Sequence, residues 1–458
     1  MSDLRSLAQT ARYLSREECQ AIARKALGFV TSPDGARVNI NSGSQGNTRF
    51  AVNQVSTGGD NYDTSVTVTA HVGHRSGSST TNQLDDASLR QAVDTAERLA
   101  RLAPEDPEYL PELGPQTYQA GTNWSDATAA LDPQGRAEAV RAITAPASGG
   151  QLVSTGFLDA RAGSSAVANT NGLFAWERGT AAALTTTVRT PDGTGSGWSG
   201  ASHYDWARID PAALGARAAE KARASRNPVA IEPGRYTVVF EPTAVGNLVQ
   251  FIAFALNARA ADEGRSFFSK QGGGNKIGSK VVDERVTITS DPFDPDVAGA
   301  PFTGEGLPTR RSVWIDHGVV TSLNYDRYWA QKKGVEPTAS GGSLKMSGGS
   351  STMDEMIAST PRGLLVTRFW YLRPVDQRTI LYTGLTRDGT FLIENGKITR
   401  AVKNLRFNDS PVFMLNNLDA LGTPERVSAS EDGGPGQAIM VPPLKVRDFN
   451  FTSLSDAV

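Results

Sequence analysis

The sequence has little cysteine and no excess of charge of either sign. Its one cysteine, Cys19, excludes an internal disulfide framework and a zinc cluster built from several cysteines. Cys19 lies at helical spacing from Ile22, Ala23 and Ala26, so we expect a buried structural thiol rather than a nucleophile. The 46 Lys and Arg residues nearly balance the 48 Asp and Glu residues. The composition therefore gives no electrostatic reason to expect nucleic acid or an anionic membrane as a partner.

Long apolar runs and a secretory signal are also missing. The longest apolar run, residues 248–256, is too short to span a bilayer. The first residues, MSDLRSLAQTARYLS, lack the apolar core and cleavage signal of a secretory peptide. We therefore expect a soluble cytoplasmic protein. With 458 residues, the chain is long enough for two or three domains with sizeable cores.

The hydrophobic pattern predicts an α+β fold in two parts. Residues 1–227 combine amphipathic helices with alternating strands and predict an α/β domain, in which two loosely repeated units cover about 1–105 and 125–227. Helix starts are marked by a Ser15/Glu18 capping box and by two Asp-Pro pairs. Residues 233–458 form a β-rich domain of strands and hairpins, with one buried helix.

That buried helix is predicted over residues 242–258, in the stretch EPTAVGNLVQFIAFALNARA. It is apolar nearly all round, so it must be covered by protein on most sides. Thr243, Asn247, Gln250 and Asn257 nevertheless form one uncharged polar stripe. These side chains need hydrogen-bond partners, which a closed chamber, a partner protein or nearby backbone could supply.

The sequence contains few of the common catalytic patterns. The four histidines are His71, His74, His203 and His317. His71 and His74 are three residues apart at a strand end, so their side chains point to opposite faces, and we expect a surface or loop role for both. We expect His203 and His317 to be structural or solvent-exposed. The glycine-rich segments at 270–280 and 193–203 match neither a phosphate-binding loop nor the nucleophile elbow of a serine hydrolase.

A series of short motifs resembles one known family. In order along the chain, these are NTRFAVNQV, GHRSGSSTTN, NTNGLFAWERG, PGRYTVVFEPTAVGNLV, EGRSFF, GEGLPTRRSVWIDHGVV, GLLV and FLIENGKI. Together they resemble the TldD/PmbA metallopeptidase family from about residue 35 to residue 450. Each motif is weak alone, and their shared order makes the resemblance specific.

The resemblance also implies where a zinc site would lie. The active branch of the family, TldD, carries His-Glu-x-x-x-His on the corresponding helix and a Cys near the C-terminus. Aligned without gaps, the pattern places its first His at Pro242, its Glu at Thr243 and its second His at Asn247, while the Cys falls near Asp432. Proline has no donor atom, an amide is a poor zinc ligand, and a threonine hydroxyl is no general base near neutral pH.

The sequence is therefore most similar to the TldE/PmbA branch, the subunit without the metal motif. This resemblance implies a heterodimer with a TldD-like partner that supplies the zinc, and a substrate of small or unfolded peptides. We expect no metal or cofactor in this chain. Gln250 and Asn257, together with Arg310 and Arg311 beside Glu305, are candidates for contacts to the chamber or the partner, although Arg310 and Arg311 also suit a solvated hairpin edge.

Two other functions remain open. A non-catalytic module could bind or carry a peptide by adding it to a sheet edge, acting alone or as a homodimer. Alternatively, a rebuilt site of Asp432, Asn247 and His203 or Glu241 could bind a harder cation such as Mg²⁺, although no spacing supports it.

Overall fold

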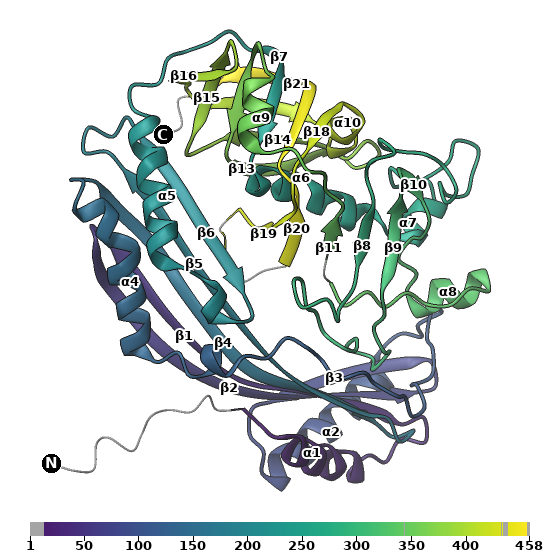
Figure 1. The fold of residues 1–458 in the computed structure, drawn as a ribbon. Coiled ribbons are helices and arrows are strands. Elements are labelled where there is room, and N and C mark those ends of the chain that lie inside the picture. Colours follow the sequence, from purple (N-terminus) through teal and green to yellow (C-terminus); the bar gives the residue numbers. More distant parts are fainter. Residues whose placement is uncertain (1–12, 343, 432, 434–437, 456–458) are drawn as a thin grey trace, which may run out of the picture.

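The computed structural model describes residues 13–342, 344–431, 433 and 438–455. The chain forms two parts, and Figure 1 shows the C-terminal part lying against the concave side of a long curved sheet from the N-terminal part. The predicted α+β architecture in two parts is confirmed. The domain boundaries remain a prediction. No helix in these ranges is long and apolar enough to cross a membrane.

The N-terminal part is a six-stranded antiparallel sheet in the order β3-β2-β1-β4-β5-β6. In β1, inward and outward residues alternate in burial, which is the period of a strand covered differently on its two faces. The strands are Ala36–Ala51 (β1), Gln54–Val72 (β2), Arg75–Thr81 (β3), Val153–Asn169 (β4), Phe174–Arg189 (β5) and Ser196–His203 (β6).

Helices cover the convex face of this sheet (Figure 1). They are Arg16–Gly28 (α1), Asp86–Leu102 (α2), Asp126–Ala129 (α3), Pro133–Ser148 (α4) and Pro211–Ala224 (α5), with a 3₁₀ turn at Trp206–Arg208 (η1). The predicted capping box is present at α1, and both Asp-Pro pairs start a helix with the Asp side chain as cap.

The sheet is nearly symmetric about its central β1–β4 pair. Each half contributes three antiparallel strands and an outer helix, α2 packing on β3 and α5 on β6. Both outer strands place a glycine under that helix. A Cβ on Gly77 would lie 2.4 Å from the Ala96 carbonyl oxygen, and one on Gly197 would lie 2.2 Å from the Ala218 carbonyl oxygen. Close packing of helix on strand therefore requires glycine at both positions.

The C-terminal part contains two more sheets and a helix between them. The nine-stranded sheet comprises Gly234–Phe240 (β7), Arg362–Val366 (β12), Phe369–Asp376 (β13), Leu381–Thr386 (β14), Thr390–Glu394 (β15), Lys397–Ala401 (β16), Leu405–Asp409 (β17), Leu418–Leu421 (β18) and Leu444–Leu454 (β21). The six-stranded sheet comprises Ile288–Ser290 (β8), Ser312–Asp316 (β9), Val319–Val320 (β10), Leu344–Met346 (β11), Glu425–Ser428 (β19) and Ala438–Val441 (β20).

The helices of this part are Pro242–Ala255 (α6), Ala258–Asp262 (α7), Arg327–Lys333 (α8), Met353–Ala358 (α9) and Pro411–Asn416 (α10). Of these, the sequence pattern described above predicts α6. The helices α7, α8 and α10 were not predicted, because helices of five to seven residues are too short to show a 3.6-residue period.

The buried helix ends earlier than predicted. The helix predicted over residues 242–258 stops at Ala255, and a second helix, α7, begins at Ala258. The Asn257 side chain caps α7 by accepting from the Ala260 N–H at 2.7 Å. The core of the C-terminal part surrounds α6 and includes its Val245, Leu248 and Ile252 side chains. Asn257 therefore does not belong to the same helix face as Asn247.

Candidate functional site

The start of α6 is the candidate site, because the sequence places the degenerate zinc motif there. β7 runs directly into Glu241, and Pro242 occupies the first helical position, where a missing N–H costs nothing. The Glu241 carboxylate forms a 2.6 Å ion pair with Lys221 of α5, which joins the two parts of the chain at this point. Thr243 is partly buried in the first turn.

Asn247 is fixed by backbone on two sides. Its side chain is 1% exposed. The Nδ2 atom donates to the Ala429 carbonyl at 3.0 Å, and Oδ1 accepts from the Phe369 N–H at 3.2 Å. The amide thus connects α6 to the start of β13 and to the segment after β19. Its polar groups are satisfied in the way that buried amides require.

Gln250 continues this contact one turn along α6. Its Nε2 donates to the same Ala429 carbonyl at 2.6 Å and to the Asn247 carbonyl at 3.0 Å. Gln250 and Asn257 also line a pocket of about 350 Å³, together with Phe254 and Trp314. The structure therefore brings Gln250 and Asn257 to one cavity, although Asn257 reaches it from the next helix.

The segment that follows Ala429 is anchored by a buried arginine and a half-buried glutamate. Arg368 donates to the Glu431 carbonyl at 2.7 Å, pairs with Asp388 at 3.4 Å, and lies 4.4 Å from the ring centre of Trp198 in β6. The Glu431 carboxylate accepts from two backbone N–H groups of β13 at 2.8 Å each. Asp432, the predicted position of the family's cysteine, lies outside the described residues.

The residues at the family's zinc positions do not fit zinc. Pro242 offers no donor atom, and the Asn247 amide is already engaged at both ends. Zinc prefers imidazole and thiolate ligands. Within the described ranges, no three His, Cys, Asp or Glu side chains are close enough together to hold a metal.

The chain's own soft donors lie elsewhere. Cys19 is in α1, where burial raises the pKa of its thiol to about 11. His203 ends β6, and its Nδ1 accepts from the Asp205 N–H at 2.9 Å. Burial and the charge of Arg426 lower the pKa of His203 to about 4, so its ring is neutral at physiological pH.

Arg310 and Arg311 are both exposed on the segment before β9. Arg310 donates to the Pro337 carbonyl at 2.7 Å. Glu305, which the sequence places beside them, forms an ion pair at 3.0 Å with Arg327 of α8. Contacts of Arg310 and Arg311 to a chamber or partner remain a prediction.

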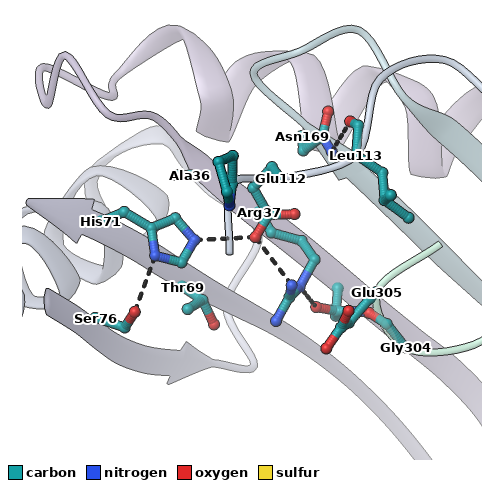
Figure 2. A network of polar contacts seen from close by, with 12 residues as sticks. Ala36, Arg37, Thr69, His71, Ser76, Glu112, Leu113, Asn169, Gly304 and Glu305 are labelled. Atoms are coloured by element: carbon teal, nitrogen blue, oxygen red, sulfur yellow. Dashed lines mark hydrogen bonds and ion pairs between the residues drawn. The ribbon is translucent and has the colours of Figure 1, made fainter. Parts of the chain in front are cut away.

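Contrary to the predicted surface or loop role, His71 is buried, with 5% exposure. Figure 2 shows its ring between Ser76 and Glu112, 2.9 Å from each. Arg37 also reaches Glu112 Oε1 at 2.9 Å. Burial opposes ionisation of Glu112, but the hydrogen bond from His71 and the charge of Arg37 outweigh it and lower the carboxyl pKa.

Glu112 belongs to the strap, the irregular segment of residues 103–124 between α2 and α3. The strap contacts both parts of the chain. Glu108 forms a bidentate pair with Arg259 of α7 at 2.7 Å, and the Pro111 carbonyl accepts from Arg327 of α8 at 2.7 Å. Because Glu112 binds the N-terminal sheet, the strap holds the two parts together at a second place, distant in sequence from the Lys221–Glu241 pair.

Comparison with known proteins covers both parts. Three family models described as PmbA/TldA metallopeptidase domains match: domain 1 over residues 36–100, the central domain over 125–226 and the C-terminal domain over 233–453. A metalloprotease of Methanothermobacter thermautotrophicus is 27% identical over 267 residues, which are 53% of this chain and 55% of that protein. Metalloprotease PmbA of Escherichia coli O157:H7 is 24% identical over 178 residues, 38% of each chain.

These alignments thus span about half or less of the length of the curated relatives. Among solved structures, TldE from Thermococcus kodakarensis superposes with a TM-score of 0.82, covering 95% of this chain and all of that one. At 17% sequence identity, this is a likeness of fold.

Proposed function

The chain belongs to the PmbA/TldD metallopeptidase family, and we propose that it is a TldE/PmbA-like subunit without a zinc site of its own. In this proposal, it forms a heterodimer with a TldD-like subunit in the cytoplasm. The partner supplies zinc and the general base, and the pair cleaves small or unfolded peptides. The chain described here shapes and closes the space in which the peptide lies.

The observation that carries this proposal is the engagement of Asn247. A side chain that ligates zinc must direct a free lone pair into an open space. Asn247 instead uses its oxygen and its nitrogen on two backbone groups of its own chain. With Pro242 one turn before it, α6 offers two positions without a usable ligand, and the helix serves as packing for the core of the C-terminal part.

Gln250 and Asn257 support a role in the peptide chamber. Both reach the pocket of about 350 Å³ beside α6, where amide groups can bond to the backbone of a bound peptide without selecting its sequence. We place Arg310 and Arg311 at the rim, where exposed cations contribute to the contact with the partner or to the rate of association.

The test is to co-express the chain with a TldD-like subunit that retains His-Glu-x-x-x-His. We expect a stable complex with about one zinc ion per pair. Peptide cleavage is expected to stop when the partner's motif glutamate is changed to Gln, and to persist when Asn247→Ser is introduced here. Stoichiometric zinc and peptide cleavage by the purified single chain would refute the proposal. Retention of peptide without turnover would instead support the carrier function.

A further inference from the structure

A groove of about 650 Å³ crosses the concave face of the N-terminal sheet. Its floor is a row of glycines, Gly43, Gly163 and Gly179, which lie directly opposite one another on β1, β4 and β5. Helices cover the other face of the sheet, and the C-terminal part lies on this side (Figure 1). We call this feature the glycine groove. At Gly43 and Gly163 the side chains are missing in register, so a ligand can approach the backbone of two strands. At Gly179 the Asn123 amide covers the strand, because a Cβ there would lie 2.8 Å from its Nδ2 atom.

The walls of the glycine groove are rows of polar side chains. One row includes Asn41 and Ser165, which share a hydrogen bond of 3.0 Å. The opposite row includes Gln45 and Arg161, and both bind the buried Asp159 carboxylate, at 2.9 Å and 2.7 Å. Since adjacent residues on a strand are about 3.3 Å apart, these two rows are separated by roughly 13 Å at the backbone, enough for an extended peptide. These four wall residues already have partners.

Glu177 extends the first wall onto β5 and differs from its neighbours. In the described ranges no hydrogen bond or ion pair reaches its carboxylate, and the Oε2 atom is buried without a partner. Burial alone raises the pKa of Glu177 to about 7. An isolated carboxylate in such surroundings is costly, because its charged form has lost water and gained no donor.

A second acceptor without a donor lies close to it. The Oδ1 atom of Asn123, in the strap, is likewise buried and has no partner among the described atoms. A Cβ on Gly121 would lie 3.1 Å from Asn123 Oδ1 and 3.7 Å from Glu177 Oε2, so the two oxygens border the same small space. Two acceptors from two elements therefore converge where none of the described residues donates a hydrogen bond to them.

When Glu177 is ionised, the chemistry of this pair favours a donor with positive charge. A primary ammonium carries three N–H donors and a compact charge, so one such group satisfies both oxygens and neutralises Glu177. Water donates hydrogen bonds without charge. A divalent cation needs more oxygen ligands than one carboxylate and one amide supply.

We propose that the glycine groove binds a peptide in extended form and that Glu177 and Asn123 hold a primary ammonium group of that peptide, either its N-terminus or a lysine side chain. This inference rests on the proposed function, which supplies a peptide to this face of the sheet. It adds a preference to that function: peptides with an ammonium within reach of β5 bind more tightly.

The test uses the isolated full-length chain and calorimetry at pH 7 with three hexapeptides of Ala, Gly and Ser. One has a free N-terminus, one is N-acetylated, and one is N-acetylated with a single Lys. For the peptide whose ammonium group is bound, we expect Glu177→Gln to lower the affinity at least about tenfold. The affinity for the N-acetylated peptide without Lys should not change. The comparison of the first and third peptides distinguishes an N-terminal amine from a lysine side chain.

Asp94→Asn is the matched control, because Asp94 is exposed on α2, on the other face of the sheet, and its substitution removes the same charge. We expect it to leave the affinity of every peptide unchanged. In carboxyl ¹³C NMR, methylammonium is expected to shift the Glu177 signal, whereas tetramethylammonium, which has no N–H donor, is not.

Three results would overturn the proposal. Equal affinity for all three peptides would do so. So would an equal loss of affinity for the ammonium and acetylated peptides in Glu177→Gln, or tighter binding when Arg replaces the single Lys. Binding is measured without the partner subunit. If the ammonium peptides show no preference but the complex with the partner binds zinc and cleaves peptides, only the ammonium site is refuted. If the ammonium peptides bind as expected but no complex forms, only the proposed heterodimer is refuted.

Discussion

Asn247 and Gln250 share one acceptor, the Ala429 carbonyl, and this sharing predicts strong coupling between them. In Asn247→Ala, the buried Phe369 N–H loses its partner, while the Ala429 carbonyl keeps the Gln250 N–H. An unsatisfied buried donor costs about 1–3 kcal/mol, so with the small cavity we expect about 2–3 kcal/mol loss in the free energy of unfolding.

Gln250→Ala leaves the Ala429 carbonyl bonded to Asn247, so the expected loss is about 0.5–1.5 kcal/mol. In the double substitution, that carbonyl has neither partner and becomes an unsatisfied buried acceptor. The loss should therefore exceed the sum of the two single losses by about 1 kcal/mol or more. Thr243→Val, on the same helix and only partly buried, serves as the control and should change little.

Urea unfolding followed by tryptophan fluorescence measures this cycle, and the midpoint of the C-terminal part is the quantity compared. If the two losses simply add, the shared carbonyl does not couple the residues. If Asn247→Ala has no effect on stability, the side chain does not bridge α6 to β13, and the polar stripe must instead face an open chamber.

Three further outcomes are expected. Gly197→Ala should destabilise the protein by about 1–3 kcal/mol, because its Cβ would clash with α5, whereas Gly59→Ala, whose Cβ meets nothing within 4 Å, should be nearly neutral in urea unfolding. Burial raises the folded-state pKa of Glu177 to about 7, because the charged carboxylate is disfavoured there. The free energy of unfolding is therefore highest below about pH 4.5, where the carboxyl group is neutral in both states, and it falls as the pH rises through 7. The full shift corresponds to about 3 kcal/mol, and partial exposure reduces it, so Glu177→Gln should be more stable than the parent by about 1–2 kcal/mol at pH 8 and equal at pH 4.5. Glu112→Gln removes the charge that binds Arg37, so it should lower the free energy of unfolding by about 2–4 kcal/mol. It should also make the strap more sensitive to limited proteolysis. Unchanged cleavage would show that other contacts hold the strap.

Local signals in the sequence were sufficient for much of the fold. The Ser15/Glu18 capping box and the Asp-Pro pairs fix helix starts through contacts within four residues, so the sequence contains all the information they need. The predicted end of the buried helix was wrong, because Asn257 fits the polar stripe by its spacing and also fits a helix cap by its residue type. The cap dominates in the structure, where Asn257 bonds to Ala260.

The candidate site was less accessible to such reasoning, because its contacts join residues distant in sequence. His71 and Glu112 are 41 residues apart, and Asn247 and Ala429 are 182 apart. The register of three strands places Gly43, Gly163 and Gly179 in one row, and no periodicity in a single strand indicates that alignment.

The two hydrogen bonds at Ala429 also predict how the isolated chain responds to metal removal. The family resemblance implies that in a zinc-binding relative the metal joins the helix corresponding to α6 to the C-terminal segment. Here Asn247 and Gln250 join α6 to that segment through the Ala429 carbonyl, without a metal. A zinc site filled at 100 times its dissociation constant stabilises a protein by about 2.7 kcal/mol, so chelation of a structural or catalytic zinc would be conspicuous. We expect the urea midpoint of the isolated chain to be the same in EDTA and in excess zinc. A fall in stability of about 1 kcal/mol or more on chelation would mean that the described contacts at α6 are not what connects these segments, and that the chain holds a metal of its own.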